Sequence, residues 1–256
     1  MNNRTLFLAW QDKAKTRRWF PVGRLDVRRP ETLYRFRYVK GAKEAQDELG
    51  FKPLVDFPDF YRNYESSELF PLFQNRVLTP GRRDFHEYLE LLDLPDQADP
   101  IEILSVGGGY RATDSFEVFP KIVRRSDGSF RCRFFLHGWR HVNADSLQRL
   151  EQIKAGEKLY AAIELTNPAM HLAVQIQTTD YHVIGWAPRY LVGDLVRAIV
   201  KAPGDYEALV VRVNPVPAPS QQRLLVELRG HWPDYEPMTR EEFEPLVQIP
   251  EFAATQ

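Results

Sequence analysis

The sequence predicts an α+β protein, in which an N-terminal sheet-plus-helices module is followed by a small β-barrel with two helices. The 256 residues are enough for two ordinary domains, and 43% hydrophobic residues are enough to build a buried core. The 19 prolines, spread along the chain, argue against long helices. Short segments rich in aromatic and β-branched residues recur in both halves and are typical of strands.

The N-terminal half starts with strand signals and continues with helix signals. In residues 33–39, Tyr34 and Phe36 alternate with Arg35 and Arg37, so one face of this strand is aromatic and the other basic. We expect strands at residues 5–10, 19–25, 33–39 and 115–119, and helices at residues 42–49, 69–77, 84–92 and, from Asp99-Pro100 onward, 101–104.

Residues 121–129 are polar and contain the turn signal Asp127-Gly128, so they form the best boundary in the chain. Whether they are a linker or a hairpin between coupled modules stays open. We expect modules at residues 1–122 and 130–232, and a tail with a short helix at 233–256. In the second module we expect strands at residues 130–136, 158–164, 172–177, 182–186, 206–214 and 223–230, and helices at 143–153 and 190–200.

Charge and cysteine content narrow the function classes. The formal net charge of −1 gives no overall attraction to nucleic acid. Cys132 is the one cysteine, which excludes an internal disulfide and a thiolate-rich zinc site and suggests a reducing compartment. No signal peptide and no uncharged stretch of membrane-spanning length is found, so we expect a cytoplasmic protein that does not bind membranes.

Basic residues dominate one N-terminal stretch. Between Arg4 and Lys43 there are twelve lysines and arginines but three acidic residues. Two interpretations remain open: a solvated sheet edge, or a surface for phosphates or an acidic partner. Under the second, Arg35 and Arg37 are candidate partner-binding residues.

Catalytic and metal sites are poorly supported. Gly107-Gly108-Gly109 lacks the Lys-Ser/Thr of a phosphate loop and predicts a turn. No nucleophile elbow and no kinase or helicase signature is present, so we expect no enzyme activity and no cofactor. His137 and His141 would lie roughly 13 Å apart on an extended strand, which is poor spacing for joint metal ligation. Cys132 is expected to be a small core residue.

Three patches in the C-terminal half lie in a distinctive order. They are Phe-Leu-His-Gly-Trp-Arg-His at residues 135–141, Glu-Leu-Thr-Asn-Pro-Ala-Met-His-Leu-Ala-Val at 164–174, and Val-Ile-Gly-Trp-Ala-Pro-Arg-Tyr at 183–190. In order and spacing they resemble the HIRAN domain over residues 130–229. That family's pattern has Gly-x-Arg-Tyr, then Asn-Pro-Tyr-Asp-x-Asn-Ala-Val, then Gly-(Tyr/Trp)-x-Pro-(Arg/Lys).

The resemblance implies a compact β-barrel, of a kind that occurs alone or attached to helicase-like ATPases and that in some members holds single-stranded DNA at its 3′ end. The implied nucleic-acid-binding residues are Trp139, Arg140, His141, Asn167, Trp186 and Arg189. The chain departs from the pattern where His141 replaces the tyrosine, Ala169 and Met170 replace the Tyr-Asp pair, and Leu172 replaces the second asparagine. Both tryptophans are either core residues or stacking surfaces.

A second, looser resemblance covers residues 4–120. Phe36-x-Tyr38, Pro53-Leu54, an aromatic run from Tyr64 to Asn75, Asp99-x-Ile101-x-x-Leu104 and Gly107-Gly108 follow the order found in the N-terminal subdomain of HipA-type toxins. In that family the subdomain is not the kinase; it engages the antitoxin. The resemblance implies contact with a protein.

Two functions follow from the sequence. The first is a non-catalytic nucleic-acid-binding accessory protein, whose barrel holds single-stranded or 3′-tailed DNA and whose N-terminal module docks a toxin-like kinase or helicase-like ATPase. The alternative is a purely protein-interacting subunit, antitoxin-like or part of an assembly, whose barrel has lost the 3′-end pocket.

Overall fold

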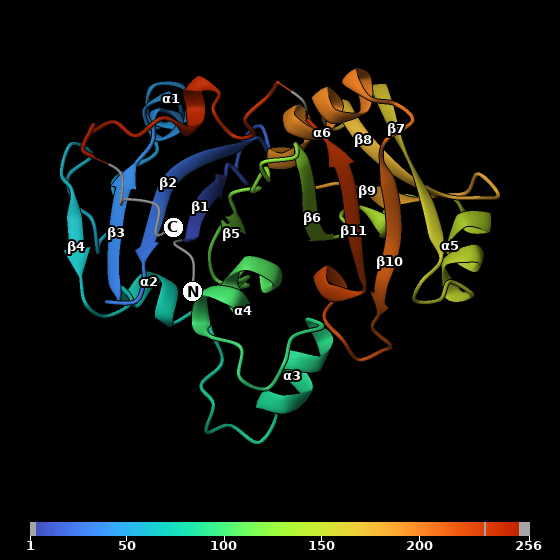
Figure 1. The fold of residues 1–256 in the computed structure, drawn as a ribbon, viewed down its shortest axis with the longest axis horizontal. Helices are drawn as coiled ribbons and strands as arrows, with labels where there is room; N and C mark the ends of the chain where they lie inside the picture. Colours follow the sequence, from blue (N-terminus) through green and yellow to red (C-terminus); the bar gives the residue numbers. More distant parts are fainter. Residues whose placement is uncertain (1–3, 233, 251–256) are drawn as a thin grey trace. The chain divides into compact units, whose positions relative to one another are not determined.

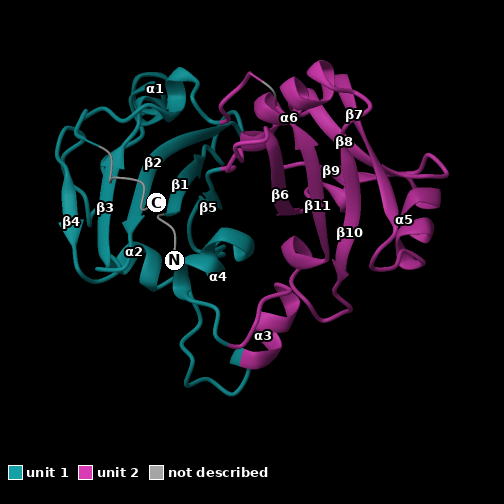
Figure 2. Cartoon of the chain, in the orientation of Figure 1, with its two compact units in different colours: residues 1–85, 97–121, 238–256 teal, residues 86–96, 122–237 magenta. Residues whose placement is uncertain are grey.

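The computed structural model describes residues 4–232 and 234–250, which fold into two compact units (Figure 2). Unit 1 comprises Met1–Phe85, Gln97–Lys121 and Met238–Gln256, and unit 2 comprises His86–Asp96 and Ile122–Pro237. Neither unit is one continuous segment of the chain.

Unit 1 is built on an antiparallel sheet of five strands in the order β4-β3-β2-β1-β5 (Figure 1). The strands are β1 (Arg4–Gln11), β2 (Trp19–Arg28), β3 (Leu33–Tyr38), β4 (Tyr64–Ser66) and β5 (Phe116–Pro120). The aromatic face of β3 was predicted, and Phe36 packs on Phe57 with ring centroids 3.8 Å apart. β2 is buried along nearly its whole length.

The helices of unit 1 are short. They are α1 (Lys40–Leu49), α2 (Pro71–Gln74), α4 (Pro100–Gly107) and the 3-10 turn η3 (Glu241–Phe243). Asp99 and Glu102 form a capping box at the start of α4, as the Asp99-Pro100 sequence indicated. The helix expected at residues 69–77 is limited to α2, which begins at Pro71, a residue that suits the first turn of a helix.

Unit 2 is built on an antiparallel sheet of six strands in the order β6-β11-β10-β7-β8-β9. The strands are β6 (Ser129–Phe135), β7 (Lys158–Asn167), β8 (His171–Thr178), β9 (Val183–Trp186), β10 (Glu207–Val213) and β11 (Leu224–His231). His137, which follows β6, and Trp186 of β9 form an isolated β-bridge between the two edges of the sheet, with both backbone N···O distances 2.9 Å. The α+β class is confirmed; no continuous pair of strands closes this sheet into a barrel within the described residues.

The helical elements of unit 2 are α3 (Phe85–Leu91, whose first residue belongs to unit 1), α5 (Ala144–Glu151), α6 (Arg189–Lys201) and the 3-10 turns η1 (Trp139–His141) and η2 (Ser220–Gln222). Asn143 caps α5 by accepting a hydrogen bond from the Ser146 backbone, 2.8 Å. One face of α6 is buried, including Leu191 and Leu195. No helix in the described part of the chain is both long and apolar enough to cross a bilayer.

Candidate functional site

The turn between β7 and β8 is organised by Asn167. This side chain is buried, and its Oδ1 accepts hydrogen bonds from the backbone nitrogens of Ala169 and Met170, both at 3.0 Å. Asparagine favours such turns because its side chain can replace a backbone acceptor. Its Nδ2 donates to Oε2 of Glu164 at 3.0 Å, so the turn is tied to the preceding strand.

Glu164 also holds Trp186. The indole Nε1 of Trp186 donates to the same Oε2 of Glu164 at 2.6 Å. One carboxylate oxygen therefore fixes the orientation of both the tryptophan and the asparagine that the sequence singled out. The sequence-based prediction did not include Glu164 as a site residue, although it lies three residues before Asn167.

Gly138, the residue before η1, packs closely against this indole. Its φ is 67°, and a Cβ at this position would lie 2.7 Å from Cε3 of Trp186. Glycine is required here for both the left-handed backbone and the close approach. The contact places the start of η1, the turn that carries Arg140 and His141, next to Trp186.

Arg189 begins α6 and is half-buried. One terminal nitrogen of its guanidinium donates to the carbonyl oxygen of Ala169. The structure therefore joins three of the predicted residues, Asn167, Trp186 and Arg189, through Glu164 and the Ala169 backbone. This is the part of the candidate site that is fixed by hydrogen bonds.

Within η1 the three predicted residues differ in their surroundings. Trp139 is half-buried, its Nε1 donates to the Ser220 carbonyl at 2.7 Å, and the guanidinium of Arg223 lies 5.9 Å from its ring centroid. Trp139 thus anchors η1 to the connection between β10 and β11. Arg140 and His141 are exposed, and among the described residues no hydrogen bond or ion pair involves the Arg140 side chain.

The outer face of β7, β8 and β9 continues from Trp186. We call it the β7–β9 face and define it by Tyr160, Ala162, Gln175, Gln177 and Trp186, which pair across the three strands as Tyr160 with Gln177, Ala162 with Gln175, and Gln175 with Trp186. All five are half-buried or exposed, whereas the alternate residues Ala161, Val174 and Ile176 are buried.

Two tyrosines form the far end of the β7–β9 face. Tyr160 and Tyr181 are 42% and 75% exposed, and their ring centroids are 5.9 Å apart. The sequence-based prediction missed both. The alternation of Lys158, Leu159 and Tyr160 is a signal that could have identified Tyr160 as exposed, but only the β8–β9 turn brings Tyr181 beside it.

Arg35 and Arg37, the predicted partner-binding residues, both form hydrogen bonds and ion pairs inside unit 1. Arg37 is 1% exposed and forms an ion pair with Asp26 at 2.8 Å, so it is no surface contact and that prediction needs correction. Arg35 pairs with Glu65 at 2.8 Å and donates to the Pro250 carbonyl at 2.8 Å. Further ion pairs engage other basic residues of the stretch from Arg4 to Lys43, namely Arg4, Arg18, Arg24, Arg28, Arg29, Lys40 and Lys43.

Metal-binding and reactive-thiol chemistry have no geometric support in the described part of the chain. No group of three or more His, Cys, Asp or Glu side chains there could hold a metal ion. Cys132 is buried, and this burial raises the pKa of its thiol to about 12.

Comparisons with known proteins give two low-level structural likenesses. No protein-family model and no curated protein matches the sequence. A crystal structure of a protein from Lactobacillus plantarum is similar over 40% of this chain and 97% of its own, at 18% identity and a TM-score of 0.32. The HIRAN domain of human HLTF is similar over 42% of this chain and 84% of its own, at 16% identity and a TM-score of 0.30. TM-scores this low do not establish a common fold, and the HipA-type resemblance of the N-terminal half stays a prediction.

Proposed function

We propose that unit 2 binds single-stranded nucleic acid along the β7–β9 face, without catalysing a reaction on it. The observation that carries the proposal is the exposed Arg140 side chain, which has no hydrogen-bond or ion-pair partner in the described residues and lies two residues from the glycine packed on Trp186. A guanidinium in this position is free to bind a phosphate.

The rest of the β7–β9 face carries side chains that can bind the bases of a single-stranded nucleic acid. Trp186 at one end and the Tyr160–Tyr181 pair at the other offer aromatic surfaces, and base stacking on such rings contributes about 1–3 kcal/mol per base. Gln175 and Gln177 between them carry amide donors and acceptors for base edges. Duplex DNA keeps its bases stacked on each other, so this face favours single strands.

The β7–β8 turn determines whether the protein can recognise the 3′ end of a nucleic-acid strand. Ala169 and Met170 offer no carboxylate to a terminal hydroxyl, and Oε2 of Glu164 already accepts hydrogen bonds from Trp186 and Asn167. We therefore propose that unit 2 contacts the nucleic acid along its length and does not recognise its 3′ end. A strand with a 3′-phosphate should bind about as well as one with a 3′-hydroxyl.

The test is fluorescence anisotropy with a labelled single strand and its duplex. We expect the wild type to favour the single strand, and Arg140→Glu to weaken binding at least tenfold because it replaces a phosphate contact with repulsion. Arg83→Glu, the same charge change at an exposed site in unit 1, is the matched control. Equal affinities for the wild type and Arg140→Glu would overturn the proposal.

The alternative, a protein-binding role for unit 2, is favoured by two exposed leucines beside the β7–β8 turn. Leu165 is 74% exposed and Leu172 is 39% exposed. This function predicts a stoichiometric protein partner in purified complexes, released by Leu165→Asp, and no anisotropy change with any nucleic acid. Docking of a kinase-like or helicase-like partner by unit 1 remains part of the proposal, to be tested by the same purification.

A further inference from the structure

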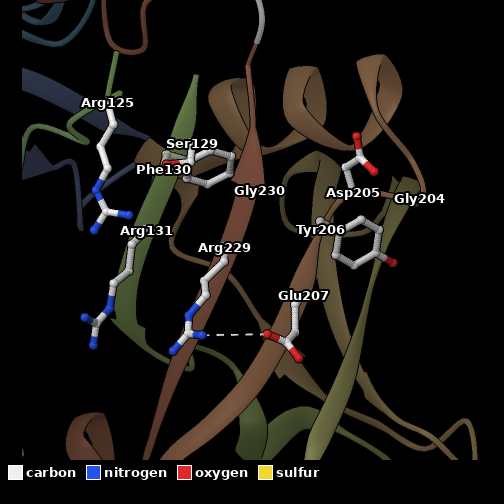
Figure 3. Close-up of a pocket in the computed structure, with 10 residues that line it drawn as sticks. All are labelled: Arg125, Ser129, Phe130, Arg131, Gly204, Asp205, Tyr206, Glu207, Arg229 and Gly230. Carbon is white, nitrogen blue, oxygen red and sulfur yellow. Dashed lines mark ion pairs between the residues drawn. The ribbon is translucent and has the colours of Figure 1, made fainter. Parts of the chain in front are cut away.

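Unit 2 has a second polar site, at the opposite end of β6 from η1. It is a pocket of about 490 Å³ between the start of β6, the end of β11 and the start of β10 (Figure 3). The lining side chains that matter here are Arg125, Arg131, Asp205, Tyr206, Glu207 and Arg229. Its volume lies within the range of roughly 300–1,000 Å³ that is usual for small-molecule sites.

A buried glutamate organises the basic wall of this pocket. Glu227 is 2% exposed and accepts hydrogen bonds from Nε of Arg131, from Nε of Arg133 at 2.7 Å and from Nε of Arg229 at 2.7 Å. Burial alone would raise the pKa of Glu227, but the three arginine hydrogen bonds outweigh it and hold the pKa below its ordinary value. The ionised carboxylate therefore holds three guanidinium groups in place.

The arginines keep donors for a ligand. Arg131 is 44% exposed, and only its Nε is bonded within the described residues, which leaves both terminal amino groups free. Arg125 is exposed, and no hydrogen bond or ion pair involves its guanidinium in the part of the chain that the structure describes. A guanidinium fork matches the geometry of phosphate oxygens, and fixing it in advance lowers the entropy lost on binding.

The start of β10 forms an acidic wall beside the basic one, on the same sheet: Glu207 pairs with Arg229, and Arg229 pairs with Arg131. Asp205 and Glu207 line it, and Glu207 lies 3.8 Å from the guanidinium of Arg229 (Figure 3). The hydroxyl of Tyr206 is occupied, since it donates to the Ala161 carbonyl at 2.8 Å. A ligand that satisfies both walls carries an oxyanion at one end and hydrogen-bond donors, such as sugar hydroxyls or a base amino group, at the other.

We infer that this pocket binds a nucleotide, with Arg125 and Arg131 on the phosphate and Asp205 accepting a hydrogen bond from the sugar or base. The inference goes beyond strand binding on the β7–β9 face and does not depend on it. The nucleotide is either free or part of a strand, and the two sources share the same chemistry.

Calorimetry with adenosine 5′-monophosphate and with inorganic phosphate tests the pocket, and anisotropy with a labelled single strand tests the second source. We expect Arg125→Gln and Arg131→Gln each to weaken phosphate-dependent binding at least fivefold. Glu227 keeps two arginines when Arg131 is replaced, and the Arg125 side chain makes no hydrogen bond or ion pair in the described residues, so both variants should fold. Asp205→Asn should weaken adenosine 5′-monophosphate but leave inorganic phosphate unchanged.

The control is Arg83→Gln, an exposed arginine outside both sites, which should leave both small-molecule affinities unchanged. Binding of adenosine 5′-monophosphate that is lost in Arg131→Gln, with strand affinity unaltered, supports a free nucleotide. No small-molecule binding, but a strand affinity lowered by both pocket variants, supports a nucleotide within a strand. The inference would be overturned if the Arg125→Gln and Arg131→Gln proteins both fold and bind all three probes as tightly as the wild type. This outcome does not depend on the result for Arg140→Glu.

Discussion

At the scale of single residues, two glutamates determine how the polar surfaces of unit 2 are presented. Glu164 orients Trp186 and Asn167, and Glu227 orients three arginines. The sequence motif led to Trp186 and Asn167 because these residue types stand out at their spacing. It did not lead to either glutamate, since an isolated acidic residue in a strand is typical of a solvated face, and only strand register places it beneath its partners.

Glu227→Gln should show the electrostatic role of this carboxylate. Because the folded pKa lies below the ordinary value of 4.5, ionised Glu227 stabilises the fold. That contribution is complete above 4.5 and is lost as the pH falls through the lowered folded value. At neutral pH the variant should lose at least about 1 kcal/mol of unfolding free energy in urea titrations. The difference from wild type should shrink in acid; a difference independent of pH would contradict the role.

At the scale of elements, the sequence was most informative where one residue type decides the backbone. Asp99-Pro100 marked the start of α4, and Asn143, the first residue of the helix expected at 143–153, caps α5. The helix expected at residues 69–77 was wrong beyond α2, because apolar spacing alone does not separate a helix from aromatic residues packed on a sheet.

Gly138→Ala should disturb the element that carries Arg140. Gly156→Ala is its matched control, because Gly156 has a φ of 84° but a Cβ added there would meet nothing within 4 Å. Both variants should cost about 1 kcal/mol for the left-handed backbone. Gly138→Ala should cost more, shift tryptophan fluorescence and weaken strand binding, because the Trp186 indole must move. Equal urea midpoints and equal affinities would show that this contact is unimportant.

At the scale of the whole molecule, the chain crosses between units more often than the sequence indicated. The change at residues 121–122 coincides with the polar stretch, but residues 86–96 belong to unit 2 and residues 238–256 to unit 1. Within unit 2, Asn214 donates to the Leu91 carbonyl at 2.8 Å, and Arg133 pairs with Asp93 at 3.0 Å. Contacts between residues so distant in the chain leave no local pattern, so one sequence alone could not predict them.

Asn214→Ala should test how residues 86–96 are held in unit 2. Asn214 is fully buried, and its Nδ2 donates to both Leu91 and Gln222. Removing the amide leaves two carbonyl oxygens without this donor and should cost about 1–3 kcal/mol of unfolding free energy. Faster hydrogen exchange in residues 86–96 should accompany the loss; unchanged exchange there would contradict this role.

The most direct measurement of strand binding by unit 2 is the salt dependence of single-strand affinity for the wild type and Arg140→Gln. Each phosphate contact on a single strand contributes about 0.7 to the slope of log affinity against log salt. We expect the wild type to bind more weakly as salt increases, and Arg140→Gln to show a slope smaller by about 0.7. A wild type without salt-dependent binding, or a variant with an unchanged slope, would contradict nucleic-acid binding through Arg140.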